Sequence, residues 1–134
     1  MTSAYSYFLS DVGLPVLAGL VVVGALAGLC VGGLPRVSTR LIGLAAVPCL
    51  TGVVYAIVLR SVSYPAGSVL THFVGGFLMS LPAVCAGAGC ASVVGLLTRS
   101  RYWGVGASIV GAVVSGPVAV NVGIVVACSF GDCI

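Results

Sequence analysis

The side chains that could carry out chemistry are few, and none has an evident partner. His72 is the one histidine, and cysteines stand at positions 30, 49, 85, 90, 128 and 133. An imidazole can ligate haem or a metal ion, or relay protons. No second histidine, no Cys-x-x-Cys pair and no carboxylate within an apolar segment completes such a site. We therefore expect no catalytic residue, no metal and no cofactor, and we interpret His72 as a hydrogen-bonded side chain at the membrane interface.

Most of the cysteines are predicted to pack as small apolar groups. The four that fall inside long apolar segments are Cys30, Cys49, Cys85 and Cys90. Cys85 and Cys90 are separated by about 140° around a helix, so they cannot share a metal ion. Cys128 and Cys133 lie at the outer end of the last apolar segment, and in an oxidising compartment they are candidates for a disulfide.

Two other polar side chains, Ser115 and Asn121, flank Pro117 in the last apolar segment. Proline has no N–H, so the carbonyl of Val113 loses its helical partner and the helix is expected to kink. We expect Ser115 or Asn121 to bond the freed groups or to reach a neighbouring helix.

The composition indicates the kind of protein that carries these residues. Of 134 residues, 60% are hydrophobic and 5% are charged, and the chain contains neither Lys nor Glu. Soluble domains are about 25% charged. The composition therefore excludes a soluble enzyme, a disordered chain and a nucleic-acid-binding protein, and it predicts an integral membrane protein surrounded by the lipid bilayer.

Four apolar segments are long enough to cross a bilayer, which takes about 20 residues. They cover residues 12–34, 41–59, 68–97 and 102–130. The short connections between them make neighbouring helices antiparallel. The prediction is an all-α polytopic membrane protein with one domain over residues 1–134, in which four transmembrane helices form two antiparallel hairpins.

The charged residues predict the orientation. Four of them lie in the turns after the first and third segments: Arg36, Arg40, Arg99 and Arg101. On the opposite side, Arg60 is offset by Asp11 and Asp132. The positive-inside rule places the four arginines on the cytoplasmic or matrix side and both termini outside, in a bacterial or mitochondrial inner membrane.

Small residues recur at four-residue spacing, which lets helix backbones approach each other closely in lipid. These stripes are Gly24, Gly28 and Gly32; Gly52 and Ala56; Ala83, Gly87, Ala91 and Gly95; and Gly104, Ser108, Ala112 and Gly116. Two interpretations remain open. Either the stripes pack against each other within the chain, or one of them docks a partner subunit.

The pattern of hairpins resembles the four-helix proteolipid (c) subunit family of V-type ATPases. The residues that carry the resemblance are Gly52-Val53-Val54-Tyr55-Ala56, His72-Phe73-Val74-Gly75-Gly76, Ala86-Gly87-Ala88-Gly89 and Val122-Gly123-Ile124-Val125. That family carries protons on a glutamate within a helix, and here Ser115-Gly116-Pro117 occupies the corresponding place. The resemblance therefore implies a relative that does not transport protons.

These features predict a non-catalytic structural or accessory subunit of a multi-subunit membrane complex. The expected host is an energy-converting complex, either a respiratory complex or a rotary ATPase, with other membrane subunits as partners. The alternative is a small homo-oligomeric pore or transporter, with Thr51, His72, Asn121 and several serines facing a channel.

Overall fold

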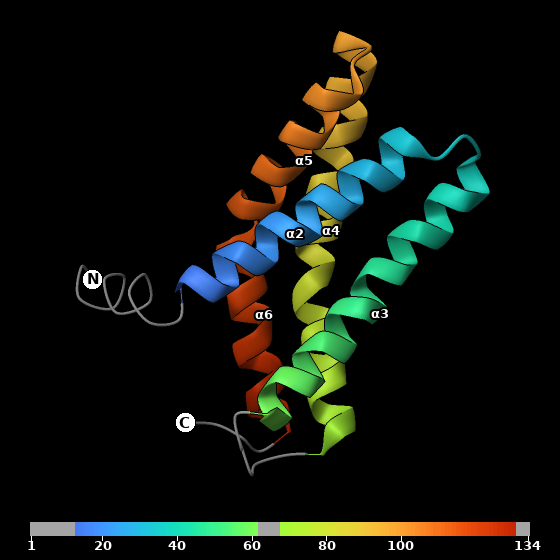
Figure 1. Cartoon of the computed structure of the whole chain (residues 1–134). Coiled ribbons are helices and arrows are strands. Elements are labelled where there is room, and N and C mark those ends of the chain that lie inside the picture. The colour runs from blue at the N-terminus through green and yellow to red at the C-terminus, as the bar shows by residue number, and fades with distance from the viewer. Residues whose placement is uncertain (1–12, 62–67, 131–134) are drawn as a thin grey trace, which may run out of the picture.

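The computed structural model describes residues 13–61 and 68–130, and the regular structure within these ranges is entirely α-helical (Figure 1). The helices are α2 (Gly13–Gly33), α3 (Val37–Ser61), α4 (Val69–Thr98), α5 (Arg101–Val114) and α6 (Gly116–Ser129). Residues 1–12, 62–67 and 131–134 lie outside the described ranges.

Three of these helices are long and apolar enough to cross a membrane. The spans comprise 20 residues in α2, 25 in α3 and 30 in α4. Helices α5 and α6 pass the same test together, so the described part of the chain has three candidate spans, or four if this bent pair forms one. The prediction of a helical, multi-pass membrane protein is confirmed at this level.

The last predicted segment, 102–130, is broken into two helices. The axes of α5 and α6 differ by 47°, and the break falls at Ser115, two residues before Pro117. Proline cannot donate to the carbonyl four residues earlier, which interrupts the helical ladder. The Ser115 hydroxyl donates to the Ala112 carbonyl at 2.7 Å, and Asn121 Nδ2 donates to the Pro117 carbonyl at 2.8 Å. Both side chains therefore bond close to the bend and do not reach another helix.

Helix α3 begins at Val37, earlier than the expected residue 41. The Thr39 hydroxyl donates to the Arg36 carbonyl at 2.7 Å, within the turn before the helix. Arg40 Nε donates to the Leu34 carbonyl, also at 2.7 Å. The Arg40 side chain thus connects the first turn of α3 to the end of α2.

Helix α4 is the centre of the arrangement, because it contacts each of the other described helices. Helix α2 crosses α4 and α5 obliquely, α3 also runs obliquely to α4, and α6 packs beside the first half of α4 (Figure 1). Helix α2 contacts α5 more extensively than it contacts α3, the next helix in the chain. Contact between α2 and α3 includes Gly43, which lies close to Cys30 and Leu34.

The interior is made of small side chains and the outside of large ones. The buried apolar residues are Val23, Ala27, Val47, Ala56, Ala83, Val84, Ala91, Ala112 and Ala119. Leucine, isoleucine, valine and aromatic side chains are exposed along all the described helices. In a bilayer there is no hydrophobic gain from moving a large apolar side chain out of lipid into the protein. Small residues, in contrast, allow the helices to pack closely.

Candidate functional site

Three helices meet closely at Ser108. Its hydroxyl donates to the Gly24 carbonyl at 2.6 Å, which links α5 to α2. The Ser108 side chain is fully buried, and it lies against Gly28 of α2 and Gly87 of α4. We call the group formed by Gly24, Gly28, Gly87 and Ser108 the Ser108 crossing.

Glycine is required at this crossing because backbone meets backbone. A Cβ added at Gly24 would lie 2.8 Å from the Ile109 Cα, and one added at Gly28 would lie 2.9 Å from the Val105 Cα. A Cβ at Gly87 would lie 2.8 Å from the Ser108 hydroxyl oxygen. Such distances are too short for an ordinary carbon contact, so any larger residue must push the helices apart.

Helices α4 and α5 also meet at Gly111, which the four-residue stripes did not include. A Cβ added there would lie 2.9 Å from the Ala86 carbonyl oxygen and 2.8 Å from Cys90 Sγ. The sequence does contain a sign that Gly111 packs against a helix. Gly111 follows Gly104 by seven residues, which is two helical turns, so both glycines lie on one face.

Helices α3 and α4 meet through glycines and aromatic side chains. A Cβ at Gly52 would lie 2.8 Å from the Phe73 carbonyl oxygen, and one at Gly76 would lie 2.6 Å from Tyr55 Cβ. The rings of Phe73 and Phe77 stack with their centroids 6.2 Å apart. Gly52 was expected in a packing stripe, whereas Gly76 was not. Ala56, the other member of that stripe, is buried.

Other members of the stripes lie in different surroundings. Ala83, Ala91 and Ala112 are buried, and a Cβ at Gly116 would meet Leu20 Cδ1 at 3.0 Å. Toward the turn between α4 and α5 the contacts loosen. A Cβ at Gly104 would lie 3.4 Å from the nearest atom, one at Gly32 would lie 4.0 Å away, and one at Gly95 would have nothing within 4 Å.

His72 lies half-buried in the first turn of α4, where its backbone N–H donates to the Ser68 carbonyl at 3.2 Å. Over residues 13–61 and 68–130, no hydrogen bond involves its imidazole, so the expected side-chain partner stays a prediction. Within the same ranges, no group of three or more His, Cys, Asp or Glu side chains is placed to hold a metal ion.

The cysteines occupy varied positions. Cys30 is half-buried, and Cys49, Cys85 and Cys90 are exposed; all four are free thiols. Cys128 is disulfide-bonded. The predicted pair of Cys128 with Cys133 includes a residue outside the described ranges, so the identity of this pair stays a prediction.

No family model, curated protein or solved structure matches this chain. The resemblance to the proteolipid subunits therefore stays a prediction. The class that the fold itself defines is a helical membrane protein, and its candidate site is a helix-packing centre.

Proposed function

We propose that this chain is a non-catalytic structural subunit of a multi-subunit membrane complex. The observation that carries the proposal is the Ser108 crossing, where three helices meet through glycine and one buried hydroxyl. Such a centre sets the spacing of helices but contains no group that changes charge. The described residues also contain no carboxylate side chain, because Asp11 and Asp132 both lie outside them. An ion relay through lipid depends on ionisable groups at membrane depth.

The outer faces of the helices support a partner within the membrane. Only 22–28% of the residues in the three long spans are buried within the chain, so most of their surface meets lipid or another protein. Five glycines have no neighbouring atom within 4 Å of an added Cβ: Gly19, Gly33, Gly89, Gly95 and Gly106. In a helix, glycine costs about 1 kcal/mol relative to alanine, and a close approach by a second protein would offset that cost.

The polar side chains favour a subunit over a pore. Thr51 donates to the Val47 carbonyl at 2.8 Å, Ser92 to the Ala88 carbonyl at 2.8 Å, and Asn121 to the Pro117 carbonyl at 2.8 Å. Each side chain is therefore bonded to the backbone of its own helix.

We further propose an energy-converting complex as the host, a respiratory complex or a rotary ATPase, on the basis of the resemblance given above. In this proposal the bent pair α5–α6 forms the fourth span, and the four spans make two antiparallel hairpins. The arginine-bearing turns then face the cytoplasm or matrix of a bacterial or mitochondrial inner membrane, and both termini lie outside.

The test is native mass measurement after the tagged chain is extracted from its own membrane in mild detergent. We expect a large hetero-complex. Gly106→Leu should remove the partner subunits, whereas Val110→Leu, on an exposed side chain of the same helix, should retain them. A small homo-oligomer in all three preparations would contradict the proposal and favour the pore.

A further inference from the structure

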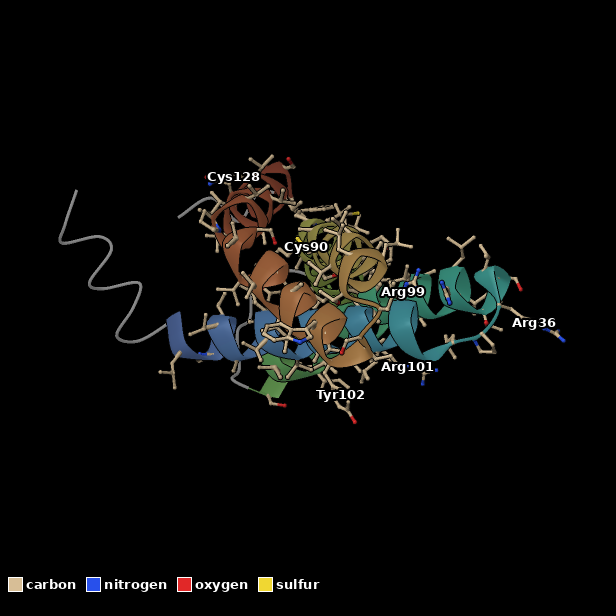
Figure 2. All side chains as sticks on the ribbon, turned by 90° about the horizontal axis from the view of Figure 1, so that it is seen from above. Arg36, Cys90, Arg99, Arg101, Tyr102 and Cys128 are labelled. Atoms are coloured by element: carbon tan, nitrogen blue, oxygen red, sulfur yellow. The ribbon has the colours of Figure 1, made fainter. Side chains whose placement is uncertain are left out.

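A cavity of about 330 Å³ opens at the end of the molecule where the α2–α3 and α4–α5 turns lie. Its walls include the small residues Gly32 and Gly95 together with three arginines, Arg40, Arg99 and Arg101. Figure 2 views the molecule from this end and shows Arg99 and Arg101 on opposite sides of the α4–α5 turn. The cavity exists because the small-residue contacts loosen here, as Gly32 and Gly95 have no close neighbour across the gap.

We propose that this cavity binds the phosphate of an anionic phospholipid headgroup. Three arginines, one from α3 and two from the α4–α5 turn, line this one cavity. A guanidinium presents paired N–H donors that match the oxygens of a phosphate, and basic pockets between membrane helices suit lipid headgroups. Arg40 is already oriented, because its Nε donates to the Leu34 carbonyl at 2.7 Å.

The backbone at Arg99 fixes where one of these arginines starts. Arg99 ends α4 with φ 52°, the one positive φ among the described residues that are not glycine, and its N–H donates to the Gly95 carbonyl at 3.0 Å. Glycine is the residue that usually occupies this left-handed position. This left-handed residue ends α4 at the cavity, so Arg99 is one of the residues that line its wall.

The start of α5 adds to the positive potential. This helix of 14 residues begins at Arg101, and Ser100 stands at its N-cap position without a side-chain capping hydrogen bond. Both residues line the cavity. The N–H groups of an uncapped first turn and the helix dipole favour an anion at this point.

The surroundings favour a lipid over a free anion. Leu96, which lines the cavity, is 81% exposed, and Leu97 next to it is 79% exposed. Tyr102 and Trp103 are 91% and 68% exposed on the adjoining turn of α5. Aromatic side chains of this kind lie at the membrane–water boundary, and exposed leucines beside the cavity provide an apolar surface for acyl chains.

The experiment measures lipid retained by the full chain in mild detergent, using native mass spectrometry. The probes are phosphatidylglycerol, phosphatidylcholine and inorganic phosphate. We expect the chain to retain phosphatidylglycerol in preference to phosphatidylcholine, and inorganic phosphate at millimolar concentration should not displace it. Arg99→Gln with Arg101→Gln should weaken retention about thirtyfold, since each arginine beside an anionic lipid contributes roughly fivefold.

Two further variants separate a built site from a merely basic surface. Arg36→Gln removes the same charge from an arginine that does not line the cavity and that lies away from Arg99 and Arg101 in Figure 2, so retention should stay within about twofold of wild type. Gly95→Leu keeps every charge but fills the cavity wall, and it should reduce retention with the helical circular dichroism unchanged. Equal losses in Arg36→Gln and the double variant, full retention in Gly95→Leu, or displacement by inorganic phosphate would each overturn the proposal.

Discussion

The two halves of α4 pack against their neighbours by different means. In the first half, Phe73 and Met79 fill the space beside α3 and α6, and Met79 lies against Gly123. In the second half, Ala86 and Gly87 allow α5 to approach until Gly111 lies against the Ala86 carbonyl, and α2 packs beside Gly87 through the Ala27 side chain. Pro82 stands between the two halves, close to Ser80, whose hydroxyl donates to the Phe77 carbonyl at 2.8 Å.

This difference shows how a membrane bundle combines rigid and adaptable contacts. A methionine side chain has three rotatable bonds and can move aside when a neighbour grows. A carbonyl or Cα cannot move without the whole helix. We therefore expect larger side chains to be tolerated much less well at the second half of α4 than at the first. One exception is Gly52 of α3, which lies against the Phe73 carbonyl in the first half.

The largest expected effect comes from Gly24→Leu. Its side chain would collide with Ile109 and Ala112 and would separate Ser108 from the Gly24 carbonyl. Overpacking usually costs about 1–3 kcal/mol, and an entire leucine placed against backbone should exceed that range. The measurement is reversible unfolding in SDS, followed by circular dichroism.

The control for this change is Gly19→Leu, on the same helix, where an added Cβ has nothing within 4 Å. It should leave the midpoint of unfolding nearly unchanged. Equal stability of the two variants would show that the Ser108 crossing does not hold α2 in place.

Gly111→Ala should lose more stability than Gly123→Ala, although both losses should be smaller than that of Gly24→Leu. The new methyl group at position 111 meets the Ala86 carbonyl oxygen at 2.9 Å, whereas at position 123 it meets Met79 Sδ at 2.6 Å. We expect a loss of about 1–3 kcal/mol in the first variant and under about 1 kcal/mol in the second, because the thioether can rotate away. If both variants lose the same free energy of unfolding, the distinction between the halves of α4 is wrong.

Ser108→Ala should produce a modest loss. It removes the interhelical hydrogen bond to Gly24, and such bonds within membranes contribute about 0.6 kcal/mol on average. Ser92→Ala is the matched change, because that hydroxyl is exposed and bonds to Ala88 of its own helix. Its unfolding free energy should stay within about 0.3 kcal/mol of wild type. A larger loss in Ser92→Ala than in Ser108→Ala would contradict the assigned role of the crossing.

An effect of opposite sign is expected for Gly106→Ala. Nothing lies within 4 Å of an added Cβ, so the isolated chain should gain up to about 1 kcal/mol from better helix propensity. SDS unfolding of the purified chain checks this expectation. A clear loss of stability would mean that the exposed face of α5 is already packed within the chain.

The sequence by itself determined the class of protein and the break in the last helical segment. Long apolar runs with few charges cannot remain in water, and Pro117 removes a hydrogen bond from the helical segment that contains it. Pro48 and Pro82 remove one each within α3 and α4, yet these helices continue through them, so a proline marks only where a break can fall. Both effects are local, so they can be read from neighbouring residues. The position of the bend beside Ser115 and Pro117 follows from the second effect.

Only the tertiary structure decided which small residues meet. Gly76, Gly111 and Gly123 make close contacts that no stripe indicated, and Gly95, a member of a stripe, faces open space. With 20 glycines, most helices have small residues on more than one face, so their pairing depends on how each helix is rotated and tilted. Arg40 lines the same cavity as Arg99 and Arg101, and this too depends on the tertiary structure. Residues distant in the chain come to one cavity only when the helices are packed.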